Sequence, residues 1–412
     1  MVSLAQNGRC PTADAAFPGP RLPQRIAHCD LDSFFVAVER LHDRSLIDRP
    51  VLVGGGGPRG VVASASYEAR SFGCRSAQPM SQALRLCPQA AVVTPHFDRY
   101  QPVSRDFHRI LDESSPAVES VGIDEAYIDL TGIDGTASPD AARRAAERIR
   151  ARVREELGIA VSICIAGSKT AAKVGSDLAK PDGLIEVPAG EEAAFLAPRP
   201  VRDLPSVGPK FGAELAAAGI RTAGEAAALD RAWLERRFGR AGAVLHDRAC
   251  GIDPSPIRAG GRPARSISRE VTFNEDVTDV AALRRTLRRH AESVGADLRR
   301  AGRRGRTVTL KLRWSDFTTL TRSLTLEQPA QSTAALAEAG VALLEALLRT
   351  EGMRPVRRIG LGATNLADDV TQLGFAELRP DEASTRRQER LDHALDEIHD
   401  RFGRESVNRG GR

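Results

Sequence analysis

The stretch VESVGIDEAYIDLT, residues 118–131, places two adjacent acids, Asp124 and Glu125, inside a run of strand-forming residues. Valine, isoleucine and tyrosine favour a pleated strand, on which successive side chains point to opposite faces. Two neighbouring acids therefore predict a turn or a junction between two strands. The segment RIAHCDLD, residues 25–32, predicts another strand, which ends near Asp30 and Asp32.

Carboxylates at the ends of two strands are suited to divalent cations, because Mg²⁺ prefers hard oxygen ligands and binds together with substrate phosphates. Each acid also has a simpler interpretation when it is taken singly. Asp124 and Glu125 could form only a turn, and Asp30 could only cap the following helix. These residues by themselves leave both interpretations open.

The remaining patterns predict an α+β protein of several domains. Strand and helix patterns alternate up to residue 187, as in a sheet covered by helices. Short helices replace the strands from 188 to 251, and LPSVGPKFGAELAAAGI (204–220) predicts a hairpin of two helices with Gly208 in the turn. Such a turn exposes backbone N–H groups that suit a phosphate, although an ordinary helical hairpin has the same pattern.

A second module follows a linker rich in Pro and Gly, residues 252–263. Its patterns read strand, helix, strand, strand, helix, strand, which is a βαββαβ unit. In RTVTLKLRW (306–314) apolar and polar residues alternate, so one face is predicted to be core and the other wet. The net charge of residues 262–375 is +6, from 19 basic and 13 acidic residues, against +5 for the whole chain. This excess suits a phosphate backbone, and a solvated charged face is the alternative.

Composition limits the protein classes that fit the chain. The six cysteines are far apart and form no CxxC pair, so a zinc site is not expected. No run of 18 apolar residues occurs, which predicts a soluble, cytoplasmic protein without membrane contact. Residues 1–24 are rich in Pro, Ala and Gly and predict a disordered leader, whereas the tail, 376–412, predicts a helix.

Five motifs together closely resemble the Y-family DNA polymerases of the DinB, or polymerase IV, class. In chain order they are CDLDSFFVAVE, SYEARSFG, GIDEAYIDLT, SKTAAKVGSDLAKPDG and LPSVGPKFGAEL. The resemblance covers about residues 25–375 and implies a right-hand polymerase. Its implied parts are a ferredoxin-like palm (25–35 and 100–187), small fingers (36–99), a helical thumb with a helix-hairpin-helix (188–251) and a βαββαβ little finger (264–375).

The resemblance also implies the activity and the residues behind it. The expected reaction is template-directed, error-prone DNA synthesis across lesions, from dNTPs on primer–template DNA, by a monomer without proofreading and with two Mg²⁺ ions. Asp30, Asp124 and Glu125 match the catalytic metal ligands, joined by the backbone carbonyl of Leu31. The implied nucleotide-binding residues are Phe35, Ser64, Tyr67, Arg70 and Lys180.

Two of these implied roles make finer predictions. Phe35 matches the steric gate that would collide with a ribose 2′-hydroxyl, with plain core packing as the alternative, and Phe34 is expected to face the core. Small residues at 61–63, VVA, match the roof over the nascent base pair and imply a loose pocket.

Further residues are implied for binding partners. The expected DNA-binding residues are Gly208, Lys210, Arg265, Arg269, Lys311 and Arg313. TQLGF (371–375) resembles a shortened sliding-clamp peptide, in which Gln372, Leu373 and Phe375 are candidate anchors. The chain departs from the family at Gly122, where serine is common, and at Ser206, which replaces the first glycine of the hairpin signature.

Two other protein classes share parts of this pattern. A non-catalytic, polymerase-like DNA-damage adaptor would keep the fold and lose the metal ligands, but all three acids are present here. A nucleotide cyclase also pairs two acids and two metals on a palm-like sheet. It would need neither the helical hairpin, nor the linker, nor the basic module.

Overall fold

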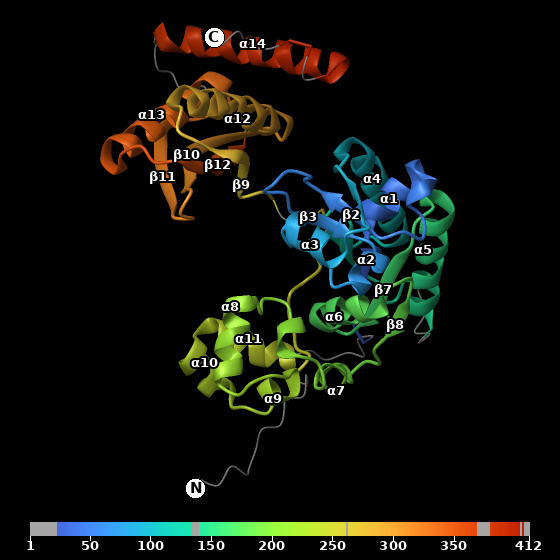
Figure 1. The fold of residues 1–412 in the computed structure, drawn as a ribbon. Helices are drawn as coiled ribbons and strands as arrows, with labels where there is room; N and C mark the ends of the chain where they lie inside the picture. The colour runs from blue at the N-terminus through green and yellow to red at the C-terminus, as the bar shows by residue number, and fades with distance from the viewer. Residues whose placement is uncertain (1–22, 134–139, 261–262, 369–379, 404–405, 408–412) are drawn as a thin grey trace. The chain divides into compact units, whose positions relative to one another are not determined.

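The structure is a computed structural model that describes residues 23–133, 140–260, 263–368, 380–403 and 406–407. The chain divides into two compact units (Figure 1): Met1–Gly56 with Gly60–Arg262, and Gly57–Arg59 with Pro263–Arg412. Within the described residues, no helix combines the length and the apolar character needed to cross a membrane.

A five-stranded sheet forms the centre of the first unit. Its order is β5 (Val118–Ser120), β6 (Glu125–Asp129), β1 (Ile26–Leu31), β7 (Val161–Ala166) and β8 (Leu184–Glu186). The β7–β8 pair is parallel, and the other neighbours are antiparallel. The stretch 118–131 thus forms two strands, with Asp124 in the junction between them, which confirms the predicted turn.

Helices cover both faces of this sheet. Helices α4 (Phe97–Ser114) and α5 (Ala141–Leu157) share a core with Ala27, Cys29 and Leu31 of β1. Because side chains alternate along a strand, the intervening residues of β1 point the other way, toward α6 (Lys169–Ala179). His28 and Asp30 accordingly contact side chains of α6.

The first unit also contains a separate three-stranded sheet. Its strand order is β3 (Val62–Ala65), β2 (Val51–Gly54) and β4 (Ala91–Val93). Its core includes apolar residues of α2 (Tyr67–Ser71) and α3 (Met80–Leu86). On β2, Val51 and Val53 belong instead to the core shared with α1 (Phe34–His42). A short 3₁₀ helix, η1 (Arg44–Leu46), follows α1.

Short helices occupy residues 188–251, as predicted. They are α7 (Glu192–Leu196), η2 (Val201–Asp203), α8 (Pro209–Ala217), α9 (Ala223–Ala227), α10 (Arg231–Phe238) and α11 (Arg240–Ala249). The prediction of two helices within 204–220 is wrong, because that range contains only α8. The segment between α7 and α8 carries three prolines, which disfavour helical backbone at the residues before them.

The second unit confirms the predicted βαββαβ order. It consists of β9 (Ser266–Val277), α12 (Val280–Arg300), β10 (Arg303–Trp314), β11 (Thr319–Ala330), α13 (Thr333–Glu351) and β12 (Val356–Asp368), with the antiparallel sheet order β11-β10-β12-β9. Val308, Leu310, Leu312 and Trp314 are fully buried in a core with both helices. The opposite face is wet except at Thr307, whose hydroxyl accepts a hydrogen bond from Asn365 and is buried.

The tail helix predicted in 376–412 is present as α14 (Pro380–Phe402) and is held by Arg299 of α12. The Arg299 side chain is only 4% exposed, and its Nε and Nη2 donate to Asp396 at 2.6 and 3.0 Å. Its Nη1 lies 3.4 Å from the buried Asp392, which also accepts a hydrogen bond from the Thr333 backbone N–H. The tail helix is therefore an integral part of the second unit.

Replacing Arg299 with alanine is expected to destabilise the second unit by about 3 kcal/mol, because the buried Asp392 would lose its ion pair with Arg299. The urea midpoint of this unit's unfolding measures the loss. Arg300→Ala is the matched control, since Arg300 is 57% exposed and pairs at the surface. It should change stability by less than about 0.5 kcal/mol. Equal losses in the two variants would contradict the anchoring role of Arg299.

Candidate active site

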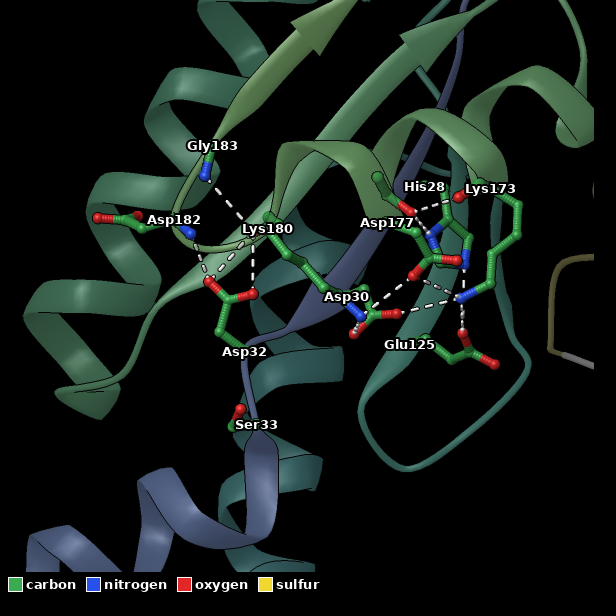
Figure 2. A network of polar contacts seen from close by, with 12 residues as sticks. His28, Asp30, Asp32, Ser33, Glu125, Lys173, Asp177, Lys180, Asp182 and Gly183 are labelled. Atoms are coloured by element: carbon green, nitrogen blue, oxygen red, sulfur yellow. Dashed lines mark hydrogen bonds and ion pairs between the residues drawn. The ribbon is translucent and has the colours of Figure 1, made fainter. Parts of the chain in front are cut away.

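The strand register brings two of the three predicted catalytic acids together. Asp30 near the end of β1 pairs directly with Glu125 at the start of β6. Directly opposite residues of antiparallel strands point to the same face, so both carboxylates lie on the face toward α6 (Figure 2). The Leu31 N–H donates to the Asp124 carbonyl at 2.9 Å, which holds the third acid at the junction.

Two ammonium groups lie among these acids. Lys173 Nζ is 3.1 Å from Asp30 Oδ2 and 2.6 Å from Glu125 Oε2, and Lys180 Nζ is 2.8 Å from Asp30 Oδ1. Burial by itself would lower the pKa of Lys173, but Asp30 and Glu125 outweigh burial and raise this pKa. Lys173 therefore stays charged and neutralises part of the acidic cluster.

Sequence reasoning assigned Lys180 and missed Lys173, although both lie in the quoted motif SKTAAKVGSDLAKPDG. Lys173 lies on α6 and Lys180 directly follows that helix, so the available signal was only their spacing of seven residues, which is close to two helical turns.

The side chain of His28 lies beside the Glu125 carboxylate. Its ring is fully buried, with Nδ1 2.7 Å from Ser176 Oγ and Nε2 3.5 Å from Glu125 Oε2. Burial lowers the pKa of His28. The nearby His28 ring and the Lys173 ammonium together lower the pKa of Glu125 to about 2, against the opposing effect of burial. Glu125 is thus ionised at neutral pH.

Asp124 differs from its neighbour in its electrostatics. Burial, followed by repulsion from Asp30 and Glu125, raises the pKa of Asp124.

Within the described parts of the chain, no three His, Cys, Asp or Glu side chains are close enough to enclose a metal ion. Lys173 and Lys180 engage the acids instead. The donors nevertheless fit Mg²⁺, because they are carboxylate oxygens whose mutual repulsion a divalent cation would relieve.

Gly122 lets these acids approach the turn. A Cβ atom at this position would lie 3.0 Å from Glu125 Cγ and 3.2 Å from Asp124 Oδ1. The departure from the serine common in the family therefore leaves more room beside the two carboxylates.

Asp32, which follows Asp30 in the motif, has a different surrounding. It is 6% exposed and accepts hydrogen bonds from Ser162 Oγ, Tyr67 OH and the Asp182 N–H at 2.9, 3.0 and 2.6 Å. Because β1 ends at Leu31, Asp32 no longer follows the strand alternation that directs Asp30 toward α6. Asp32 therefore anchors the surrounding loops rather than joining the acidic cluster.

The predicted nucleotide-binding residues come from different elements of the first unit. Tyr67 and Arg70 of α2 stack, with the guanidinium 4.8 Å from the ring centroid. Arg70 Nε donates to the Ala65 carbonyl, and Ser64 is only 7% exposed. Lys180 lies apart from these three, against Asp30.

The aromatic pair at the start of α1 divides as predicted. Phe34 is 2% exposed and belongs to the core, whereas Phe35 is partly exposed. The Phe35 ring stacks on Tyr100, with the ring centroids 4.3 Å apart and the planes at 11°.

The strand register of the second unit determines which face of its sheet each of these basic residues occupies. Lys311, Gly360 and Glu270 are cross-strand neighbours on the open face, and Arg313 pairs with Arg358 there. Arg269 pairs with the buried Leu361 and contacts Asp297 of α12, so it does not share the open face with Lys311 and Arg313, and its DNA-binding role stays a prediction. Arg358 is the residue of this face that sequence reasoning missed. Arg358 is placed on this face by the pairing of β12 with its neighbouring strands, and the sequence of a single strand does not give that pairing.

The other described residues that were predicted to bind DNA lie at the start of α8 or next to β9. Gly208 immediately precedes α8, no side chain caps that end of the helix, and Lys210 in its first turn is exposed. Ser206 has φ of 72°, a region that favours glycine, and its Oγ accepts a hydrogen bond from Arg248. Arg265 is exposed just before β9. Gln372, Leu373 and Phe375 lie outside the described residues, so clamp binding stays a prediction.

Models of known families match three parts of the chain. The impB/mucB/samB family model matches residues 29–177, its C-terminal domain model matches 264–375, and the IMS family HHH motif matches 189–220. The last match contains α7, η2 and α8 and therefore extends beyond the range 204–220 predicted for the hairpin. Among solved structures, the Y-family DNA polymerase chimera Dbh-Dpo4(243-245)-Dbh covers 84% of this chain and 99% of its own, with a TM-score of 0.75 and 24% identity. That match shows the fold.

The fold and the acidic site together define a right-hand polymerase. Proteins named DNA polymerase IV are 41% identical in Dehalococcoides mccartyi strain CBDB1, over 94% of this chain and 97% of that protein, and 40% identical in Caulobacter vibrioides, over 93% of each. A third, from Streptomyces coelicolor, is 42% identical over 88% of this chain and 75% of its own length. The chain belongs to the DNA polymerase IV class of the Y-family and is a DNA-directed DNA polymerase.

Proposed function

We propose that this polymerase copies damaged as well as intact templates, with low fidelity and without proofreading, by a nucleotidyl transfer that uses two Mg²⁺ ions. The nucleotide would pass from a dNTP to the primer 3′-hydroxyl. The observation that carries the proposal is the cross-strand pairing of Asp30 with Glu125 beside Asp124.

Asp30, Asp124 and Glu125, with the carbonyl of Leu31, are the residues that would hold the ions. Bound Mg²⁺ would lower the pKa of the attacking hydroxyl and neutralise charge on the phosphates. Arg70 offers a planar fork to phosphate oxygens, and Lys180 offers a point charge close to Asp30. Lys173 offsets the negative charge of Asp30 and Glu125 and so limits their repulsion.

We assign the parts of the hand to the described elements. The five-stranded sheet with α4, α5 and α6 would be the palm, and the three-stranded sheet with α2 and α3 the fingers. Helices α7 to α11 would form the thumb, and the βαββαβ unit the little finger. On that unit, Lys311, Arg313 and Arg358 share the open face and are the proposed contacts to DNA phosphates.

Damage tolerance is supported by the residues predicted to form the roof over the nascent pair. Val61 and Ala63 are exposed, whereas Val62 between them is 1% exposed and belongs to the core. The roof would therefore consist of the small side chains of Val61 and Ala63. Small side chains give little steric selection against an altered template base.

Primer extension past an abasic analogue, compared with an undamaged template, tests this proposal. Wild type is expected to bypass the lesion. Val61→Trp should lower the ratio of bypass to normal extension about tenfold, because the larger side chain crowds the pair. Val61→Thr keeps the volume and is the control. Failure of wild type to bypass, or an unchanged ratio in Val61→Trp, would refute damage tolerance through an open roof. A primer with a mismatched 3′ end should not be shortened when nucleotides are omitted.

A further inference from the structure

A buried carboxylate lies behind the proposed steric gate. Glu39 follows Phe35 by one turn of α1 and is only 2% exposed. Its Oε1 is 2.5 Å from Tyr100 OH and 2.9 Å from His96 Nδ1, and its Oε2 accepts a hydrogen bond from Arg99 Nη1 at 2.9 Å. All three partners lie at the beginning of α4.

Tyr100 connects this carboxylate to Phe35. The Tyr100 side chain is fully buried, and its ring stacks almost parallel to that of Phe35. Burial and the hydrogen bond to Glu39 raise the pKa of Tyr100, so the phenol stays protonated and donates to Glu39. Phe97 contacts Phe35 edge-on, with the centroids 5.7 Å apart, and is itself exposed. The buried Phe34 ring also contacts Phe35, with the centroids 5.7 Å apart, but Tyr100 is closer and stacks on the ring, so it is the main support of Phe35.

Burial of the Glu39 carboxylate costs free energy, so its presence in the core indicates a role other than filling space. A carboxylate removed from water is tolerated only when ion pairs and hydrogen bonds compensate it. Glu39 obtains that compensation from Tyr100 and Arg99 of α4 and from His96, which directly precedes this helix. An apolar residue would fill the same space without fixing the Tyr100 ring through its hydroxyl.

The position of a gate must be fixed for the gate to discriminate. A 2′-hydroxyl is one small group, so a slight retreat of the Phe35 ring would make room for it. A ring backed by a stacked and hydrogen-bonded partner cannot retreat in this way without breaking the Glu39–Tyr100 hydrogen bond.

We propose that Glu39 is a positioning residue for sugar selection, which acts through Tyr100 on the Phe35 ring. The proposal rests on the proposed gate role of Phe35. It adds a specificity-determining carboxylate that would touch neither the nucleotide nor the metal ions.

The test compares kcat/KM for dCTP and CTP on one primer–template in wild type, Glu39→Gln, Tyr100→Phe and the double variant. Loss of one hydrogen bond should lower the dCTP-to-CTP ratio about threefold to tenfold, through better use of CTP. Use of dCTP should stay within about twofold of wild type. Tyr100→Phe removes the bond to Glu39, whereas Glu39→Gln weakens it, because a neutral amide oxygen is a poorer acceptor than a carboxylate. The effect in the double variant should therefore not exceed that of Tyr100→Phe.

Two control variants separate the possible outcomes. Glu68→Gln breaks an ion pair with Arg40 on the same helix α1 but contacts no ring of the gate, so it should leave the ratio unchanged. Phe35→Ala tests the gate itself, and an unchanged ratio there would refute the gate role and this inference with it. If Phe35→Ala lowers the ratio while Tyr100→Phe leaves it unchanged, the gate stands and the role of Glu39 is refuted. A proportional loss for both nucleotides would likewise show a purely structural role. If Glu39→Gln does not fold, the dCTP-to-CTP ratio of Tyr100→Phe alone tests the proposal.

Discussion

Replacing Asp124 with alanine is expected to abolish primer extension while leaving the affinity for primer–template DNA unchanged. Removal of one ligand of a charge-stabilising ion should cost several kcal/mol of transition-state stabilisation, or roughly 10³-fold in rate. The fold should not suffer. The raised pKa of Asp124 means that its ionised form is disfavoured in the folded protein, so its removal relieves repulsion at neutral pH.

Single-turnover extension with Mg²⁺, DNA binding by fluorescence anisotropy and thermal unfolding together check this expectation. Asp177→Ala is the matched control, because Asp177 is an exposed acid of the same neighbourhood, 3.2 Å from Lys180 Nζ, and is not a proposed ligand. Its extension rate should fall by less than about threefold. Loss of DNA binding together with extension in Asp124→Ala would indicate misfolding, and full activity would show that Asp124 is not a ligand.

Replacing Phe35 with alanine is expected to admit ribonucleotides, with a loss of roughly 100-fold in the preference for dNTPs. The reason is steric, since the partly exposed ring is the group proposed to collide with a ribose 2′-hydroxyl. The ratio of kcat/KM for dCTP and CTP measures the change.

Phe34→Leu separates gating from packing in the aromatic pair. Phe34 is buried in the core and its ring lies 5.7 Å from that of Phe35 and 6.1 Å from that of Tyr100, between centroids, so its truncation should lower thermal stability and change the sugar preference far less than Phe35→Ala does. A sugar preference that stays at the wild-type value in Phe35→Ala would return Phe35 to the alternative of plain core packing.

Several features of the site followed from local sequence alone. The alternation of apolar and polar residues predicted the buried face of β10, and the order of patterns predicted the βαββαβ unit. The adjacent acids predicted the junction at Asp124, and the motif CDLDSFFVAVE, through its resemblance to the family, predicted that Phe34 faces the core. These are properties of one element or one turn, so the residues within a few positions of each other determine them.

Other features depended on how separate elements pack. The register between β9 and β12 places Arg269 on the helix-covered side and Arg358 on the open face, and neither strand records that register by itself. The end of β1 at Leu31 separates Asp32 from Asp30, and the packing of α6 on the sheet brings Lys173 between Asp30 and Glu125.

The family, the order of the elements and the catalytic acids proposed here were predictable from the sequence, because motifs and periodicities are local. The partners of the long charged side chains became evident only from the folded chain. Lys173, Arg299 and Glu39 each contact groups far away in the chain. Their roles depend on the distances between elements, which are set by the packing of the whole core.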